Sequence, residues 1–475
     1  MSNGRKAHWK TSAVSDMTTG SPIRLLLGFA APLFVGNLFQ QLYSAVDTMI
    51  AGYNLGDTAV AAIGATSALY SLLVNLAAGL NSGYGIVAAQ TYGSKNYPKL
   101  RKVAGAMAAL NLTVTLVLTV LSLLFLRPLM ALMQVPDTLF HDAYLYIGVI
   151  LGGMVTTIAY NMFAGFMRAM GNSRTPLYFL IISCLTNLSM DVVFIVGLGW
   201  GVQGAAAATV IAQGLSAVLA GVYVFRNYKE VLPRREDFFP DWPLMREMTG
   251  IGISMAAMYC VVDLGSVVYQ RSINALGLYM GDAVITAHTA ARRIIGIMMM
   301  PLGSISTAYA TFVGQNWGAK KTERLKQTLK QVLCMEIGWG VCSCVMVFAA
   351  GGTMVHLLTN TTSPDVLQNA VLSLRCHFLC YPALGVLFAL RNALQSIGQK
   401  MIPVLSSGVE LGAKLIAGLW LIPRYGYMVV CLTEPVIWVV CAAFLAGFFL
   451  FKKPFDTREE QNDRWGKGLK RRLGT

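Results

Sequence analysis

The chain has 475 residues, of which 55% are hydrophobic and 12% are charged. Soluble proteins carry about 25% charged residues, so this composition and the mean hydropathy of +0.58 predict a chain that lies mostly in lipid. They exclude a cytosolic enzyme and a nucleic-acid-binding protein. The net charge of +15, from 37 Lys and Arg against 22 Asp and Glu, more often reports orientation in a membrane protein than a nucleic-acid surface.

Apolar stretches recur along nearly the whole chain, and each is long enough to cross a hydrocarbon core of about 30 Å as a helix. We predict an all-α polytopic membrane protein with twelve transmembrane helices, six in each half. The expected helices are Arg24–Ile50, Ala59–Ile86, Lys99–Leu126, Phe140–Met167, Thr175–Val196, Val202–Phe225, Leu244–Ser272, Ala283–Val313, Arg324–Ala349, Val366–Leu394, Met401–Leu421 and Met428–Phe451.

Basic residues alternate between the loops. Both tails and every second loop together hold 30 of the 37 Lys and Arg, whereas the other loops hold Arg127 and Arg424. By the positive-inside rule, we expect both termini and the central loop Arg226–Arg246 in the cytoplasm. Met1–Ser21 is polar and basic and lacks the short apolar core of a secretory signal, so we expect no cleavage there.

The two halves repeat each other at a nearly constant offset along the chain. Matched pairs are Gln90 and Gln315, Gly93 and Gly318, Gly171 and Gly398, and Pro176 and Pro403. Because each half has an even number of helices, we expect a parallel repeat of two lobes with a cavity between them, and lobes that rock to give alternating access. The expected domains are an amino-terminal tail (1–23), an N-lobe (24–227), a cytoplasmic inter-lobe loop (228–243), a C-lobe (244–451) and a basic tail (452–475).

Two acids of the first half, Asp47 and Asp191, lie within predicted helices at depths where that half offers no Lys or Arg. A carboxylate at the bilayer centre costs about 2.5 to 3.5 kcal/mol on insertion scales, so each acid needs a partner or a task. Some polar residues lie three or four positions apart on the same helix faces as the two acids, and others lie on neighbouring predicted helices. They are Gln40, Tyr43, Ser44, Asn161, Ser183, Asn187, Thr209 and Gln213. This oxygen-rich set suits a proton or a monovalent cation. The alternative is that each acid only bonds neighbouring helices.

The second half carries acids and bases together in its predicted helices, and we expect these charges to neutralise one another. The acids are Asp263, Glu336, Glu410 and Glu434, and the bases are Arg271, Arg292, Arg293, Arg375 and Lys414. Structural ion pairing and the lining of a substrate path are both open. The candidate substrate cavity comprises Gln40, Asp263, Arg292, Met298, Glu410 and Glu434. Met298 could equally be core or lipid-facing filler.

Pro32 lies inside the first predicted helix, about four helical turns before Asp47. Proline removes a backbone hydrogen bond, so it can serve as a hinge that couples the protonation of Asp47 to the shape of the helix, or as a static kink. The lone histidines His141, His356 and His377 are not expected to be ligands. All nine cysteines lie in apolar segments without metal-type spacing, so we assign them no redox or zinc role.

Three segments of the chain are distinctive in combination: QQLYSAVDTMIAGYNLGDTAVAAIGA (Gln40–Ala65), RAMGNSRTP (Arg168–Pro176) and TNLSMD (Thr186–Asp191). Together they resemble the multidrug and toxic compound extrusion (MATE) family, in its bacterial DinF-like branch. The resemblance covers roughly Ser21 to Phe451 and implies that Asp47, Asn187, Asp191 and Thr209 hold the coupling H⁺ or Na⁺. It associates Tyr43 and Asn161 with that site and implies a hinge at Pro32. The related NorM branch uses a glutamate of the seventh helix, where this chain offers Asp263.

The leading hypothesis is a secondary active multidrug efflux antiporter that exchanges organic cations or amphipathic drugs for H⁺ or Na⁺. A flippase for a lipid-linked saccharide is the alternative, because Arg271, Arg292, Arg293 and Arg375 could bind a pyrophosphate. A membrane enzyme would need a clustered acid motif or a metal-spaced histidine set, and the sequence has neither. We expect no metal beyond Na⁺, no organic cofactor and no nucleic-acid partner, but small-molecule substrates and lipid contacts. The expected state is a monomer in a bacterial cell membrane.

Overall fold

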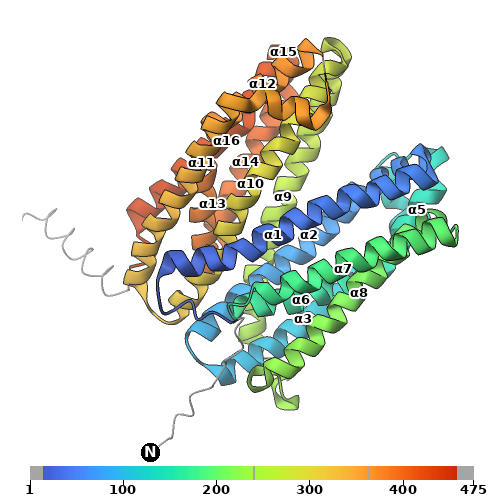
Figure 1. The fold of residues 1–475 in the computed structure, drawn as a ribbon. Coiled ribbons are helices and arrows are strands. Elements are labelled where there is room, and N and C mark those ends of the chain that lie inside the picture. Colours follow the sequence, from blue (N-terminus) through green and yellow to red (C-terminus); the bar gives the residue numbers. More distant parts are fainter. Residues whose placement is uncertain (1–13, 239–240, 362, 457–475) are drawn as a thin grey trace, which may run out of the picture. The chain divides into compact units, whose positions relative to one another are not determined.

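The computed structural model describes residues 14–238, 241–361 and 363–456, and Figure 1 shows its helices. Within these ranges the regular structure is entirely helical. The elements are α1 (Pro22–Leu55), α2 (Asp57–Gly93), α3 (Tyr97–Leu124), α4 (Leu126–Leu132), α5 (Asp137–Gly152), α6 (Met154–Ala169), α7 (Arg174–Asp191), η1 (Val192–Gly197), α8 (Gly201–Asn227), η2 (Lys229–Val231), η3 (Arg235–Phe238), α9 (Trp242–Met280), α10 (Asp282–Gly318), α11 (Thr322–Thr359), α12 (Pro364–Leu379), α13 (Tyr381–Ser396), α14 (Met401–Ile416), η4 (Ala417–Leu421), α15 (Ile422–Tyr425) and α16 (Tyr427–Lys452).

The predicted fold class is confirmed. Ten helices of the described chain are long and apolar enough to cross a membrane, and two bent pairs bring the number of spans to twelve. Several helices extend past their expected bounds, as in α9, which runs from Trp242 to Met280. The extra turns add residues at the ends of the apolar stretches, where hydropathy falls but backbone hydrogen bonding continues the helix.

The fourth and tenth spans bend, which the sequence analysis did not predict. The first bend, of 44°, separates α5 from α6 at Gly152 and Gly153. A Cβ atom on Gly153 would collide with the Val210 side chain, so only glycine allows this approach. The second bend, of 49°, separates α12 from α13 just before Pro382, whose ring nitrogen cannot continue the helical hydrogen bonds.

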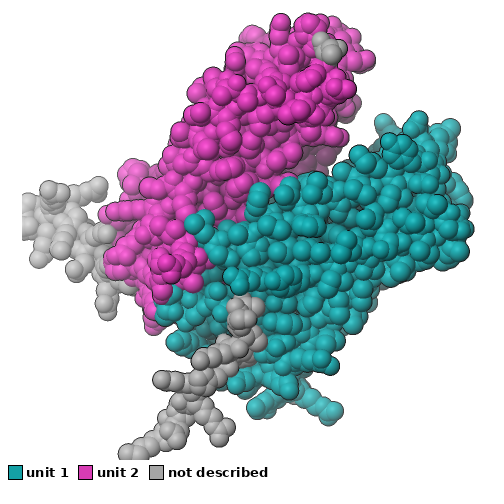
Figure 2. Space-filling model, in the orientation of Figure 1, with its two compact units in different colours: residues 1–19, 27–260 teal, residues 20–26, 261–475 magenta. Residues whose placement is uncertain are grey.

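The chain forms two compact units, which Figure 2 colours separately. The first unit comprises residues 1–19 and 27–260, and the second comprises residues 20–26 and 261–475. Helix α9 therefore contributes its first half to one unit and its second half to the other. Each unit has its own hydrophobic core: Met107 and Met167 are fully buried in the first, and Leu302 and Phe378 are fully buried in the second.

Within the first unit, α2 and the first half of α9 approach so closely that backbone nearly touches backbone. A Cβ atom on Gly83 would collide with the Cα atom of Gly252, and one on Gly79 would lie 2.5 Å from the Cα atom of Ala256. Small residues permit this contact, and close packing of this kind supplies much of the attraction between helices in lipid.

Each unit has an ion pair between its third span and the segment that follows its sixth span. In the first unit Arg101 of α3 lies 3.4 Å from Asp237 of η3, and in the second Lys326 of α11 lies 3.0 Å from Asp456, after α16. Arg101 and Lys326 occupy matched positions of the repeat. The segment that follows the sixth span of each half is therefore fastened to the third span of that half. Most of the basic carboxy-terminal tail lies outside the described residues.

Candidate ion-binding site

Three helices of the first unit bring the predicted site residues together. Tyr43 and Asp47 lie one helical turn apart on α1, Asn187 and Asp191 lie one turn apart on α7, and Thr209 lies on α8. This spacing of four places both members of each pair on one helix face. Asp191 is the last α-helical residue before the π-helical turn η1 and is 0% exposed.

The carboxyl groups of Asp47 and Asp191 lie within hydrogen-bonding reach of each other. Two ionised carboxylates can only accept hydrogen bonds, so a bond between them requires that one of the two carries a proton. The geometry brings together the two acids that the sequence analysis singled out. It gives them the arrangement of a proton-holding dyad, in which like charges oppose simultaneous ionisation.

Asn187 connects the acids to the other helices. Its amide nitrogen lies 3.1 Å from the Tyr43 hydroxyl and 3.0 Å from Oδ2 of Asp191, and its amide oxygen lies 3.0 Å from the backbone nitrogen of Thr209 and 3.2 Å from its hydroxyl. In this orientation the nitrogen donates twice and the oxygen accepts twice, whereas the opposite orientation would leave the oxygen facing acceptors. The site is therefore held by α1, α7 and α8 together.

The site has unused acceptor capacity. Oδ1 of Asp191 is buried and receives no hydrogen bond from the described residues, and neither acid belongs to an ion pair in that part of the chain. Carboxylate, amide and hydroxyl oxygens are the ligands that hard cations prefer. The arrangement can therefore bind a proton or a small monovalent cation. No group of three His, Cys, Asp or Glu side chains suited to a metal occurs among the described residues.

Other predicted residues form no hydrogen bond with Asp47 or Asp191 among the described residues. Asn161 donates to the backbone oxygen of Thr157 on its own helix, and Thr157 in turn donates to Gln213. Gln40 and Ser44 are exposed on α1. Pro32 lies inside α1, which continues as a helix on both sides of it.

Two tyrosines belong near the site but were missed from the sequence. Tyr146 of α5 lies within electrostatic range of both Asp47 and Asp191, and Tyr70 of α2 is hydrogen bonded to Gln213. The only feature of the sequence that points to these tyrosines is a phenol hydroxyl inside an apolar span. Such a hydroxyl needs a polar partner when it is buried. Aromatic residues are common in such spans, so this signal alone does not single out either residue.

In the second unit, part of the expected charge pairing is present. Arg292 of α10 lies 2.5 Å from Glu434 of α16, and Lys414 of α14 lies 3.2 Å from Glu410 and 3.9 Å from Glu434. Arg391 of α13 lies 3.6 Å from Glu410. The lone His377 also joins this network, with Nε2 3.6 Å from Glu434.

The expected pairing is wrong for Glu336. Glu336 of α11 is 0% exposed and accepts a hydrogen bond from Ser306 at 2.9 Å, and its second oxygen has no partner among the described residues. Sequence counting placed enough bases for the acids in this half, but it could not show which helices face each other. Asp263 lies half-buried on α9.

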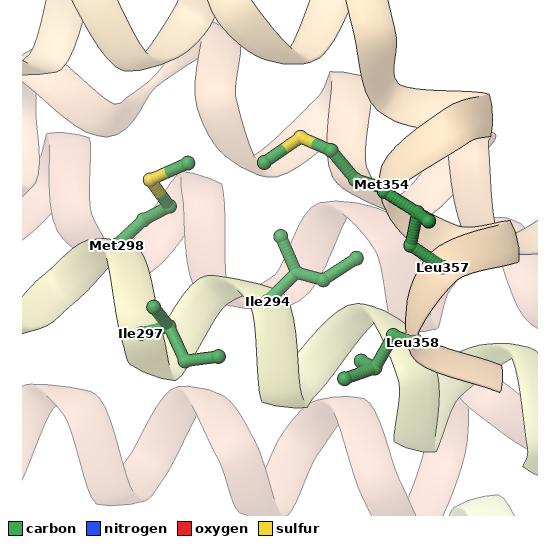
Figure 3. Close-up of a pocket in the computed structure, with 6 residues that line it drawn as sticks. All are labelled: Ile294, Ile297, Met298, Met354, Leu357 and Leu358. Carbon is green, nitrogen blue, oxygen red and sulfur yellow. The ribbon is translucent and has the colours of Figure 1, made fainter. Parts of the chain in front are cut away.

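The arginines behind the flippase alternative are partly engaged elsewhere. Arg292 is paired with Glu434, and the Arg375 guanidinium lies 5.6 Å from the centre of the Phe348 ring. Met298 lines an apolar pocket of about 280 Å³ between α10 and α11, which Figure 3 shows. Its other lining residues are Ile294, Ile297, Met354, Leu357 and Leu358. None of these side chains offers a polar group that would recognise a substrate.

Twelve apolar spans in two repeated halves define a polytopic membrane protein. The chain belongs to the MatE family, whose model matches residues 32–193 and 251–420. The resemblance drawn from the sequence is thereby confirmed, and the bacterial relatives support the DinF-like branch. Members of this family are transporters rather than enzymes, and the long apolar helices agree with a multi-pass protein of the cell membrane.

Curated relatives carry multidrug names. The chain is 28% identical over 310 residues to the probable multidrug resistance protein YoeA of Bacillus subtilis (strain 168), a match that covers 64% of this chain and 66% of that protein. It is 22% identical to the multidrug export protein MepA of Staphylococcus haemolyticus (strain JCSC1435) over 91% of this chain and 94% of that protein. A solved structure, described as the outward-facing conformation of a multidrug resistance MATE family transporter of the MOP superfamily, has the same fold. Its TM-score is 0.84 at 20% identity, over 94% of this chain and 99% of that one.

Proposed function

We propose that the protein is a secondary active antiporter that exports organic cations or amphipathic drugs in exchange for H⁺ or Na⁺. The observation that carries this proposal is the close pair of Asp47 and Asp191, which lies inside the first unit without a basic partner in the described chain. An acid kept inside a membrane without a counter-charge is expected to serve ion movement. The multidrug names of the relatives support the substrate class.

The exchange follows from the chemistry of the pair. When the inward-moving ion binds, it neutralises the carboxyl groups and strengthens the contacts among α1, α7 and α8. When the ion leaves, repulsion between two carboxylates favours a different arrangement of the same helices. An ion drives transport only if it binds the two states of the protein with different affinity. We propose that these states are the two openings of an alternating-access cycle in which the two lobes rock.

The direct test is export of an ethidium-like dye from cells that express single and double variants of the pair. Asp47→Asn and Asp191→Asn should each lower efflux at least tenfold, because an amide cannot release a proton or balance a cation. The matched control is Asp137→Asn, which changes an acid in the first turn of α5. Undiminished efflux in both site variants, at equal protein in the membrane, contradicts the proposal.

The same variants can identify the ion. In reconstituted vesicles, a proton-coupled protein releases protons when substrate is added in the absence of sodium, and Asp47→Asn should abolish that release. A sodium-coupled protein requires sodium for substrate movement and releases none. Substrate movement that persists without any ion gradient and is unaffected by either substitution contradicts antiport altogether.

A further inference from the structure

The fifth span of the first half and the eleventh span of the chain are structurally equivalent. Gly171 and Gly398, which are matched by the repeat, precede α7 and α14 and both adopt a left-handed backbone, with φ of +87° and +85°. Both helices end in a π-helical turn, η1 and η4. The same offset in residue number matches Asn187 of the first half with Lys414 of the second, and Asp191 with Gly418.

The first and seventh spans are structurally equivalent in the same way. Helices α1 and α9 end before Gly56 and Gly281, which again have matching left-handed backbones, with φ of +82° and +88°. These two glycines are separated by the same number of residues as Gln90 and Gln315. The same offset matches Asp47 with Ser272. A Cβ atom on Gly418 would lie 2.8 Å from the Ser272 hydroxyl oxygen. The counterparts of Asp47 and Asp191 therefore face each other in the second unit, as the two acids do in the first.

On the same three helices as these counterparts, the second unit holds a lysine among oxygens. The Lys414 ammonium donates to the Ser266 hydroxyl at 3.1 Å and lies 3.2 Å from Glu410 and 3.9 Å from Glu434. These oxygens come from α9, α14 and α16, the counterparts of the helices that build the first site. The Lys414 side chain is 4% exposed. Two carboxylates and a hydroxyl thus surround one positive charge.

We propose that the Lys414 ammonium is a tethered cation, held in the second unit by the counterparts of the three helices that hold the coupling cation in the first. The comparison with a coupling cation rests on the proposed function, but the occupancy of the second site does not. A primary ammonium is a compact monovalent cation with three donors, and three oxygen groups lie around this one. Shortening the lysine should therefore open a site for a small free monovalent cation, of which a primary alkylammonium is the closest match.

Both carboxylates have basic neighbours other than Lys414. Glu410 keeps Arg391 at 3.6 Å, and Glu434 keeps Arg292 at 2.5 Å and His377 at 3.6 Å. The arginines do not release their protons in proteins. Their carboxylates therefore remain available to an added cation.

The experiment is thermal unfolding of purified Lys414→Ala with propylammonium, which has the three carbons and the ammonium that the substitution removes. The variant should unfold about 5 to 10 °C below the wild type, and millimolar propylammonium should recover at least half of that difference. Equal concentrations of propanol, which has the same length without the charge, should not. Wild type and Lys99→Ala, whose lysine is exposed at the start of α3, should not respond to propylammonium. The recovery should also vanish in Lys414→Ala combined with Glu434→Gln.

A Lys414→Met variant tests the same site if Lys414→Ala does not accumulate. Methionine fills the space with a neutral chain, so this variant should be less stable than the wild type and should not respond to propylammonium. A methionine variant as stable as the wild type, or an alanine variant that propylammonium does not stabilise, overturns the tethered cation. None of these readouts needs transport, so they are separate from efflux by the Asp47 and Asp191 variants.

Discussion

Acids inside this protein are accommodated in three different ways. Asp191 lies beside Asp47, Glu434 is paired with Arg292, and Glu336 is buried with a serine as its hydrogen-bond partner. Removing the charge has a different consequence in each case. A carboxyl without a counter-charge leaves no base unpaired when it becomes an amide, whereas an ion-paired carboxylate does.

Glu434→Gln should therefore destabilise the protein, whereas Asp191→Asn should not. We expect Glu434→Gln to lower the free energy of unfolding by about 3 kcal/mol. This value is at the low end of the range for removing one partner of a buried ion pair, because the Arg292 side chain is 43% exposed. Thermal unfolding of the purified variants measures both. Adding Arg292→Met to Glu434→Gln should restore part of the loss, and a Glu434→Gln variant as stable as the wild type would contradict the pairing.

A residue that the sequence did not single out also offers a test. Tyr146→Phe removes a hydroxyl from the surroundings of Asp47 and Asp191 and leaves the ring. We expect the pH profile of dye efflux to move while the thermal unfolding midpoint stays within about 2 °C of the wild type. Tyr53→Phe, at a tyrosine that is 90% exposed on α1, is the control. A profile identical to the wild type would place Tyr146 outside the ion site.

At the scale of elements, small residues decide how helices approach. The contact of α2 with α9 at Gly83 and Gly252 leaves no room for a side chain, while Gly64 on the same α2 has nothing within 4 Å of its Cβ position. Two glycines of one helix therefore differ in their role. Gly83 allows a contact, and Gly64 only adds flexibility to the unfolded chain.

Gly83→Val should separate α2 from α9 and destabilise the first unit by about 1 to 3 kcal/mol, the usual range for overpacking. Gly64→Ala should be neutral or stabilising by up to about 1 kcal/mol, since alanine is the better helix former. The unfolding midpoint and the yield of folded protein measure both. Equal effects of the two substitutions are the outcome that this packing does not allow.

Much of the fold follows from the sequence because hydropathy alone decides which segments enter lipid. Twelve spans were predicted correctly, but the bends were not, since Gly152, Gly153 and Pro382 lie inside stretches that remain apolar. Asp47 and Asp191 were found because a charge in an apolar stretch is conspicuous. The partner of Glu336 was not found from the sequence, because it depends on which helices face each other. That arrangement is set by packing rather than by composition.

At the scale of the whole molecule, we propose from the alternation of basic loops that both termini and the loop between the halves lie in the cytoplasm. Fluorescent-protein fusions at either terminus should fluoresce, and an alkaline phosphatase fusion in the Arg226–Arg246 loop should be inactive, because phosphatase folds only outside the cytoplasm. The loop that contains Arg127 is the control and should give the opposite result. An active phosphatase in the central loop would reverse the proposed orientation.

The π-helical turn after Asp191 affects how α7 can move. Asp191 is 0% exposed, yet the next two residues, Val192 and Val193, are 49% and 47% exposed. In a π turn each amide bonds the fifth residue back instead of the fourth, so the helix can regain ordinary winding by exchanging partners rather than by losing them. A rotation of α7 about its own axis is therefore inexpensive at this place. It would turn the Asp191 carboxyl away from that of Asp47.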